Sequence, residues 1–79
     1  MITTLDRLKG GDVAVVRDIQ GGRNVRQRLS RLGVHPTDKI RVIRNDFLGG
    51  PLLMEVHGIE VGMGRGMAQH IEVEIEHVP

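Results

Sequence analysis

The sequence predicts a mainly β fold: a small closed or nearly closed barrel of about five strands, with one short α-helix inserted after the first strand. Short runs in which apolar and polar side chains alternate recur along the chain, as strands with one buried face require. One stretch around residue 28 has helical periodicity instead. An open sheet of this size would expose its edges, which closure into a barrel avoids.

The helix is predicted at residues 24–32, where an apolar residue recurs at the i, i+4 and i+7 positions of one face. These apolar residues are Val25, Leu29 and Leu32. Asn24 is expected to cap the amino end. Gly33 follows the last apolar residue, where a left-handed residue commonly closes a helix. A helix of about nine residues is too short to be stable alone, so its apolar face is expected to close one mouth of the barrel.

Five alternating segments predict the strands: residues 12–19, 39–44, 52–57, 59–63 and 71–76. The side chains expected to point inward are Val13, Val15 and Ile19 in the first segment, Ile40 and Val42 in the second, Leu52, Met54 and Val56 in the third, Ile59, Val61 and Met63 in the fourth, and Ile71, Val73 and Ile75 in the last. Imperfect alternation around Val16 and Arg17 predicts a β-bulge. Gly58, between two alternating runs, predicts a hairpin turn.

The bulk composition narrows the class of protein. A chain of 79 residues is expected to form one domain, residues 1–79. It has no cysteine, its first residues lack the pattern of a secretory signal, and no apolar run approaches the roughly 20 residues of a membrane-spanning helix. We therefore expect a cytoplasmic protein that does not insert into a membrane. Phe47 is the single aromatic residue, so aromatic platforms for single-stranded nucleic acid or for proline-rich peptides are disfavoured.

Four short motifs occur in order along the chain. They are L-x-x-L-x-x-G ending at Gly11, R-L-x-x-L-G-V-x-P from Arg28 to Pro36, G-G-P ending at Pro51, and A-x-x-I-x-V from Ala68 to Val73. Together they make the chain resemble the FeoA-like family, small cytoplasmic proteins of bacterial ferrous-iron uptake whose module also occurs at the carboxyl end of iron-dependent repressors. The resemblance implies a barrel like that of SH3 domains, in agreement with the strand pattern.

The chain departs from the family pattern after Pro36, where Thr37 stands in place of the usual glycine. A β-branched residue is strained at positive φ, whereas glycine is not. Two alternatives follow. Either Asp38 takes the left-handed conformation in place of Thr37, or the turn does not need such a conformation.

Four histidines and an acidic run near the carboxyl end invite a metal-site interpretation. The histidines are His35, His57, His70 and His77, and no two of them have the H-x-x-x-H spacing of metal ligands. We expect them on the surface. Glu72, Glu74 and Glu76 alternate along one face of the last strand and are expected to form a solvated row facing the helix arginines. No metal site and no bound cofactor are therefore predicted.

The sequence contains no familiar catalytic arrangement. It has no nucleophile elbow, no phosphate-binding loop and no Cys/His pair. Gly62, Gly64 and Gly66 form a glycine-rich stretch, but no long helix is expected after it, so it does not make a dinucleotide fingerprint. These glycines are expected to permit turns and close approach at a barrel corner. The chain is therefore predicted to be a binding module, not an enzyme, without catalytic residues.

The resemblance implies an accessory protein that docks on the cytoplasmic part of the ferrous-iron transporter FeoB and tunes its nucleotide-driven transport. From the residues, we expect a partner to contact the arginine face of the helix and the loop after the second predicted strand. The candidate partner-binding residues are Arg23, Arg26, Arg31, Phe47, Leu48 and Pro51. Exposed Phe and Leu side chains are typical anchors of an interface. The alternative is that Phe47 folds back and fills the barrel.

Two other functions compete with transporter binding. The helix arginines could bind nucleic acid, with an affinity that falls steeply as salt rises, although the scarcity of aromatic residues disfavours this function. The chain could also self-associate as a regulatory module through an uncovered sheet edge. The interpretation without a partner is a solvated helix surface whose charge is balanced by the acidic strand.

Overall fold

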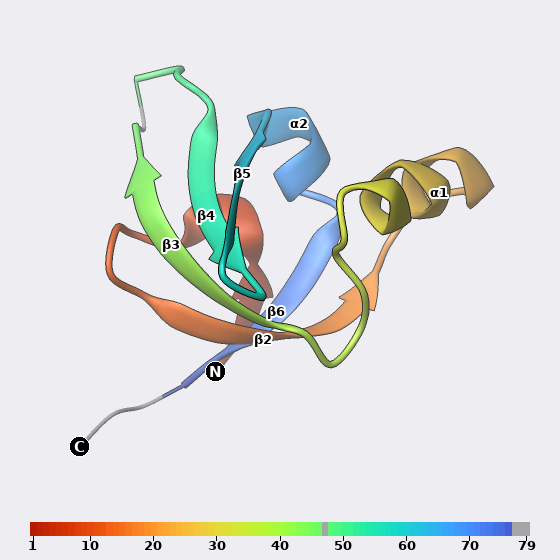
Figure 1. The fold of residues 1–79 in the computed structure, drawn as a ribbon, viewed down its shortest axis with the longest axis horizontal. Coiled ribbons are helices and arrows are strands. Elements are labelled where there is room, and N and C mark those ends of the chain that lie inside the picture. The colour runs from red at the N-terminus through yellow and green to blue at the C-terminus, as the bar shows by residue number, and fades with distance from the viewer. Residues whose placement is uncertain (47, 77–79) are drawn as a thin grey trace.

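The computed structural model describes residues 1–46 and 48–76 of the chain. Within them it contains six strands, two helices and one 3₁₀ turn (Figure 1). In chain order these are β1 (Ile2–Thr4), η1 (Leu5–Arg7), β2 (Val13–Ile19), α1 (Arg23–Arg31), β3 (Lys39–Asn45), β4 (Leu52–Val56), β5 (Ile59–Met63), α2 (Arg65–Ala68) and β6 (Ile71–Ile75). No helix in the described part of the chain has both the length and the apolarity that crossing a membrane requires.

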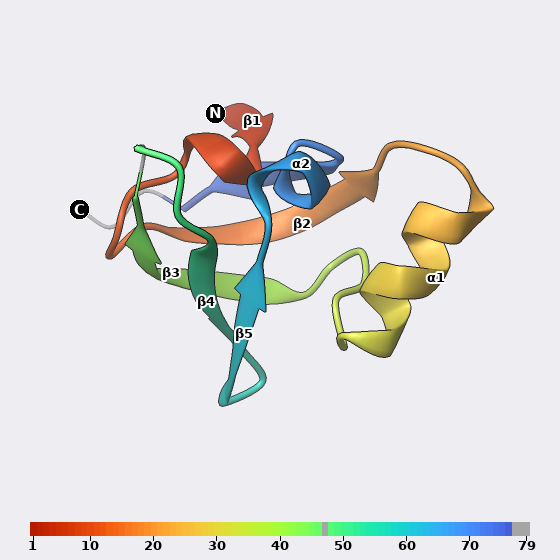
Figure 2. The same cartoon turned by 90° about the horizontal axis from the view of Figure 1, so that it is seen from above.

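The strands form one antiparallel sheet in the order β1-β6-β2-β3-β4-β5. The sheet curls strongly, but among the described residues no pairing joins its edge strands β1 and β5 (Figures 1 and 2). The predicted mainly β, SH3-like fold is therefore confirmed, while full closure is not. The prediction of five strands missed β1, because a strand of three residues is too short to show alternation.

The apolar residues inside the curl form one core. Its fully or almost fully buried members are Leu5, Leu8, Ala14, Val16, Ile19, Leu29, Val34, Ile40, Val42, Leu52, Met54, Val56, Val61, Met63, Ala68, Ile71 and Val73. The inward faces predicted for β3 and β4 are confirmed. In β6 the two leading apolar residues are buried as predicted, whereas Ile75 is half-buried at the end of the strand.

The inward face of β2 was predicted correctly only at Ile19. Ala14, Val16 and Ile19 are the buried residues, whereas Val13 and Val15 are half-buried. The cause is a β-bulge, which shifts the register between Val16 and Asp18. The bulge itself was predicted. Its extra residue, however, exchanges the inward and outward faces for the residues that precede it. Strict alternation counted back from Ile19 therefore selects the wrong residues.

The β4–β5 hairpin turns at His57 and Gly58, as Gly58 predicted. Both residues have positive φ, at 53° and 77°, which matches the twist of a two-residue hairpin loop. Val61 and Met63 then point into the core, but Ile59 is 66% exposed, against prediction. Ile59 lies directly beside the turn on β5, an edge strand that pairs on one side alone among the described residues.

Helix α1 lies beside the curled sheet at one end of the long axis of the molecule (Figures 1 and 2). Of the three residues expected to close the barrel, Leu29 is fully buried, Val25 packs partly against the core and Leu32 is 43% exposed. The helix therefore does not close the mouth as predicted. Val34, which follows the helix, is fully buried, so Leu29 and Val34 together anchor this segment in the core.

The ends of α1 agree only in part with prediction. The helix begins at Arg23, Gly22 occupies the capping position, and no side chain makes a capping hydrogen bond. Asn24 is inside the first turn and cannot act as the cap that was predicted. At the other end, Gly33 has a φ of 85° and closes the helix as expected.

The turn before β3 contains the residue that departs from the family pattern. Thr37 itself has a φ of 76°, so both alternatives drawn from the sequence are wrong. Two backbone hydrogen bonds to β2 impose this conformation. The Thr37 N–H donates to the Val16 carbonyl, and the Val16 N–H donates to the Asp38 carbonyl, each at 2.8 Å.

Candidate functional site

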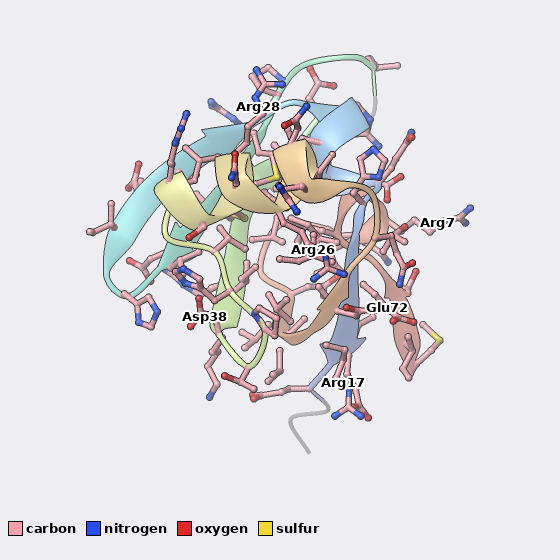
Figure 3. All side chains as sticks on the ribbon, turned by 90° about the vertical axis from the view of Figure 1, so that its right-hand side faces the viewer. Arg7, Arg17, Arg26, Arg28, Asp38 and Glu72 are labelled. Carbon is pink, nitrogen blue, oxygen red and sulfur yellow. The ribbon has the colours of Figure 1, made fainter. Side chains whose placement is uncertain are left out.

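The arginines of α1 are exposed. Arg26 lies 3.8 Å from an Asp18 carboxylate oxygen, and this is the one ion pair of α1 among the described residues. In Figure 3, Arg28 lies on the upper side of α1 and Arg26 below it. The helix therefore presents charge to solvent on more than one side.

Of the three glutamates in the acidic row, Glu74 and Glu76 do not pair with these arginines, contrary to prediction. Glu72 lies opposite Asp18, the ion-pair partner of Arg26, and is on the same side as Arg26 in Figure 3. Glu74 pairs with Arg17 at 3.3 Å and Glu76 pairs with Lys39 at 3.4 Å. Arg17 is in β2, which pairs with β6. Lys39 is in β3, which pairs with β2. These two ion pairs therefore do not neutralise the exposed arginines of α1.

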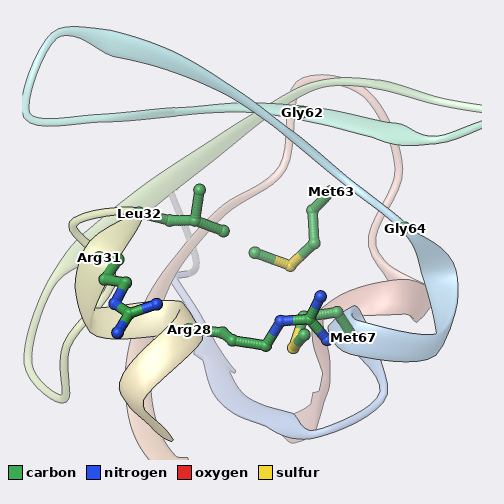
Figure 4. Close-up of a pocket in the computed structure, with 7 residues that line it drawn as sticks. All are labelled: Arg28, Arg31, Leu32, Gly62, Met63, Gly64 and Met67. Atoms are coloured by element: carbon green, nitrogen blue, oxygen red, sulfur yellow. The ribbon is translucent and has the colours of Figure 1, made fainter. Parts of the chain in front are cut away.

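A groove of about 510 Å³ runs between the carboxyl end of α1 and the β5–α2 connection. It is lined by Arg28, Arg31, Leu32, Gly62, Met63, Gly64 and Met67 (Figure 4). Leu32 and Met63 point into it from opposite sides, and the Arg28 guanidinium reaches toward Met67. The groove thus has an apolar floor and a cationic rim.

The predicted contact residues divide between two distant surfaces. Arg23, Arg26 and Arg31 lie on α1, and of these Arg31 alone lines the groove. Leu48, which is 97% exposed, and Pro51 lie on the β3–β4 loop, at the opposite end of the molecule from α1 (Figures 1 and 2). The structure therefore does not bring the two predicted halves together.

Phe47 lies outside the described residues, so its role as an interface anchor or as a barrel plug stays a prediction. Its neighbours form a compact turn around Asp46. The Leu48 N–H donates to the Asp46 carboxylate at 2.9 Å, and the Gly49 N–H donates to the Asp46 carbonyl at 3.2 Å. This turn holds the backbone while the Leu48 side chain extends into solvent.

Sequence reasoning missed most of the groove. Leu32 was predicted on the buried face of the helix and Met63 in the core, and neither Arg28 nor Met67 was predicted as a contact residue. The sequence feature that could have indicated the groove is the glycine-rich stretch Gly62-x-Gly64-x-Gly66. None of these glycines has positive φ, and a Cβ added to any of them would meet no atom within 4 Å. Their predicted role in turns and close approach within the chain is therefore wrong.

A polar cluster around Asp38 joins the turn before β3 to the β4–β5 hairpin. Asp38 accepts a hydrogen bond from the His35 N–H at 2.8 Å, and its carboxylate lies 2.9 Å from Nε2 of His57. Partial burial raises the pKa of Asp38, but the His35 backbone hydrogen bond and the two imidazoles outweigh it, so the pKa lies below its usual value. Within residues 1–46 and 48–76 no group of three or more His, Asp or Glu side chains is arranged to hold a metal ion.

A model of the FeoA domain matches residues 3–75, which is almost the whole chain. The chain belongs to the FeoA domain family. The family resemblance carried by the four sequence motifs is thereby confirmed. Among curated proteins, this FeoA-domain chain is 36% identical over 66 residues to "Putative Fe(2+) transport protein A" of Methanocaldococcus jannaschii, covering 84% of this chain and 78% of that protein.

Solved FeoA structures share the fold closely. The crystal structure of an iron uptake regulatory protein, FeoA, superimposes with a TM-score of 0.92 at 32% identity, covering 96% of this chain and 100% of that one. A manganese-dependent transcriptional repressor in complex with manganese superimposes with a TM-score of 0.88 at 21% identity, covering 95% of this chain and 37% of that one. The repressor likeness shows a shared fold alone.

Proposed function

We propose that this FeoA-family protein is an accessory protein of ferrous-iron uptake, a one-domain cytoplasmic module that binds the cytoplasmic part of a FeoB-type transporter and turns over no substrate. The observation that carries the proposal is the surface of α1, where exposed arginines adjoin a half-exposed leucine and an apolar groove. Arginine and methionine are enriched at protein interfaces. The similarity to a protein named for Fe(2+) transport supports iron uptake as the setting.

The α1 surface is the primary contact in this proposal. Arg23, Arg26 and Arg31 are exposed along it, and the β3–β4 loop with Phe47, Leu48 and Pro51 makes a separate contact. The longest extent of the molecule is 36 Å, so a partner that engages both surfaces has to reach along its whole length. We therefore expect substitutions on the two surfaces to weaken binding independently.

The experiment is a calorimetric titration of the chain with the purified cytoplasmic part of the transporter. Arg23→Glu reverses a charge on α1 and Leu48→Asp removes the exposed loop side chain. We expect each to weaken binding by roughly tenfold, since a reversed charge or a lost anchor at an interface commonly costs 1–2 kcal/mol. Arg7→Glu is the matched control, because Arg7 is an exposed arginine on η1. The proposal is wrong if the unmodified chain does not bind.

Nucleic-acid binding is the competing function, because the exposed helix arginines are a feature that it also needs. A titration with DNA and RNA at two salt concentrations separates the two functions. Binding through phosphate contacts weakens steeply as salt rises, since each contact releases counterions. Tight, salt-sensitive binding to nucleic acid with no affinity for the transporter would replace the proposal.

A further inference from the structure

Strand β5 is an edge of the sheet, and the groove lies along it. Its partner on one side is β4, whereas the other side carries no strand in the described part of the chain. Gly62 in β5 and Gly64 directly after it form one wall of the groove, and Arg28 and Arg31 of α1 line it on the opposite side. Backbone groups of an edge strand are open to pairing with another chain.

No contact with the described residues accounts for the glycines of this wall. Gly62 is in a strand interior, where glycine weakens a strand and often marks a close approach by another backbone. Its φ is not positive, and an added Cβ would meet nothing within 4 Å. Neither backbone conformation nor internal packing therefore requires a glycine at this position, but a segment lying along the wall would.

The remaining groove residues indicate the chemistry of such a segment. Leu32, Met63 and Met67 form an apolar floor, and methionine adapts its shape to varied side chains. Arg28 and Arg31 flank this floor with guanidinium groups, which pair with carboxylates in a bidentate manner. Glu60 is exposed at the other end of β5 and repels carboxylates there. An acidic side chain is therefore favoured at the α2 end of the groove.

We infer that the free edge of β5 and this groove bind an extended, acidic segment of the partner protein, which adds to β5 as a further strand. One apolar side chain of the segment packs on Leu32, Met63 and Met67, and its carboxylates pair with Arg28 and Arg31. The inference deepens the proposed function and rests on it, because it names the part of the partner that is bound.

Two variants test the groove. Gly62→Leu places a side chain where the wall is bare backbone, and Arg28→Glu with Arg31→Glu reverses the charge of the rim. Gly66→Leu is the matched control for the first, because Gly66 belongs to the same glycine stretch, also has open space around it and does not line the groove. Arg7→Glu is the control for charge. Circular dichroism and thermal melting establish that each variant is folded.

The first measurement is an NMR titration of the labelled chain with the cytoplasmic part of the transporter. We expect the largest amide shifts at residues 28–32 and 59–64, and affinity at least about tenfold lower for the two groove variants than for their controls. If the transporter binds both groove variants as tightly as the unmodified chain, the inference is wrong and the proposed function stands.

The second measurement uses a probe that does not depend on the transporter. A short capped peptide of alternating glutamate and valine is compared with its lysine-for-glutamate version. We expect the acidic peptide to bind the unmodified chain and Gly66→Leu, but not Gly62→Leu, and the basic peptide to bind none. Equal binding of the two peptides overturns the inference. Acidic-peptide binding at the groove without transporter binding overturns the proposed function alone.

A second copy of this chain is the other candidate occupant. Light scattering over a range of concentrations decides it. We expect the chain to stay monomeric when no partner is present. A dimer that dissociates in Gly62→Leu but not in Gly66→Leu would assign the groove to self-association and overturn the inference.

Discussion

Thr37 holds a left-handed backbone conformation, at a φ of 76°, with a β-branched side chain. This conformation costs an L-residue with a Cβ about 1–2 kcal/mol, and glycine avoids the cost while losing some entropy on folding. The strain persists because the turn is held by two hydrogen bonds to Val16. A glycine at this position would therefore relax the same turn.

We predict that Thr37→Gly raises the free energy of unfolding by about 0.5–1 kcal/mol. Urea denaturation measures it. Thr3→Gly, in the short strand β1, is the control and is expected to lower stability, because glycine is unfavourable in a strand. A loss of stability in Thr37→Gly equal to that in Thr3→Gly would show that the turn is not strained.

Asp38 is predicted to make stability depend on acid pH. Its pKa is lower in the folded chain than its ordinary value of 3.8. A lowered folded-state pKa means that the stabilisation is fully present above 3.8 and is lost as the pH falls through the folded-state pKa. The carboxylate then no longer accepts hydrogen bonds as an anion from the His35 N–H and the His57 ring.

The variant Asp38→Asn is expected to cost about 1–2 kcal/mol at neutral pH, because charge-assisted hydrogen bonds are lost at a partly solvated site. Urea denaturation from neutral pH to well below 3.8 should show this difference shrinking with acidity. Glu60→Gln, at an exposed carboxylate of β5, is expected to show a small difference throughout. A difference for Asp38→Asn that stays constant over this range would contradict the prediction.

At the scale of one element, α1 is held by few contacts. Leu29 has no exposed surface, whereas Leu32, one turn further on, is 43% exposed. Because a helix of nine residues is not stable alone in water, its position depends on the buried side chain. Leu32 instead belongs to the groove, where a side chain can be replaced without opening the core.

Leu29→Ala should therefore lower the free energy of unfolding by about 2–5 kcal/mol, as for a fully buried leucine. Leu32→Ala should lower it by less than about 1 kcal/mol, because much of its surface is already in water. Thermal and urea denaturation of the pair give both values under the same conditions. Equal losses for the two variants would show that Leu32 also closes the core.

At the scale of the whole molecule, three distant segments meet at Asn45. Its Nδ2 donates to the carbonyls of Asp6 and Leu8, at 3.0 and 2.6 Å, and its Oδ1 accepts a hydrogen bond from the Arg65 guanidinium. Arg65 also donates to the Asp6 carbonyl at 3.1 Å. The end of β3 is thus tied to the η1 turn and to α2, beside the loop that carries Leu48.

Asn45→Ala is predicted to lower the free energy of unfolding by about 1–3 kcal/mol, because it leaves half-buried polar groups without their partner. Asn24→Ala is the matched control and is expected to be neutral or slightly stabilising, since Asn24 is exposed in α1 and caps nothing. Urea denaturation gives both values. A larger loss for Asn24→Ala than for Asn45→Ala would reverse this assignment.

The strands with regular alternation were predictable because their signal is local. In β3 and β4 each inward residue is identified by its immediate neighbours, and the hairpin turn by a single glycine. Strand β1 was not predictable, because its pairing with β6 defines it. The inward face of β2 was not predictable either, because a bulge shifts its register. The conformation of Thr37 likewise depends on Val16, which is remote in sequence.

By itself the sequence determined the family, the mainly β architecture and an exposed arginine helix, since motifs, alternation and periodicity lie in consecutive residues. Only the tertiary structure decided that Leu32 leaves the core, that Arg28 and Arg31 face Met63 across a groove, and that Leu48 lies far from α1. These relations arise from how the curled sheet places segments that are distant in the chain. No local pattern of side chains encodes such a distance.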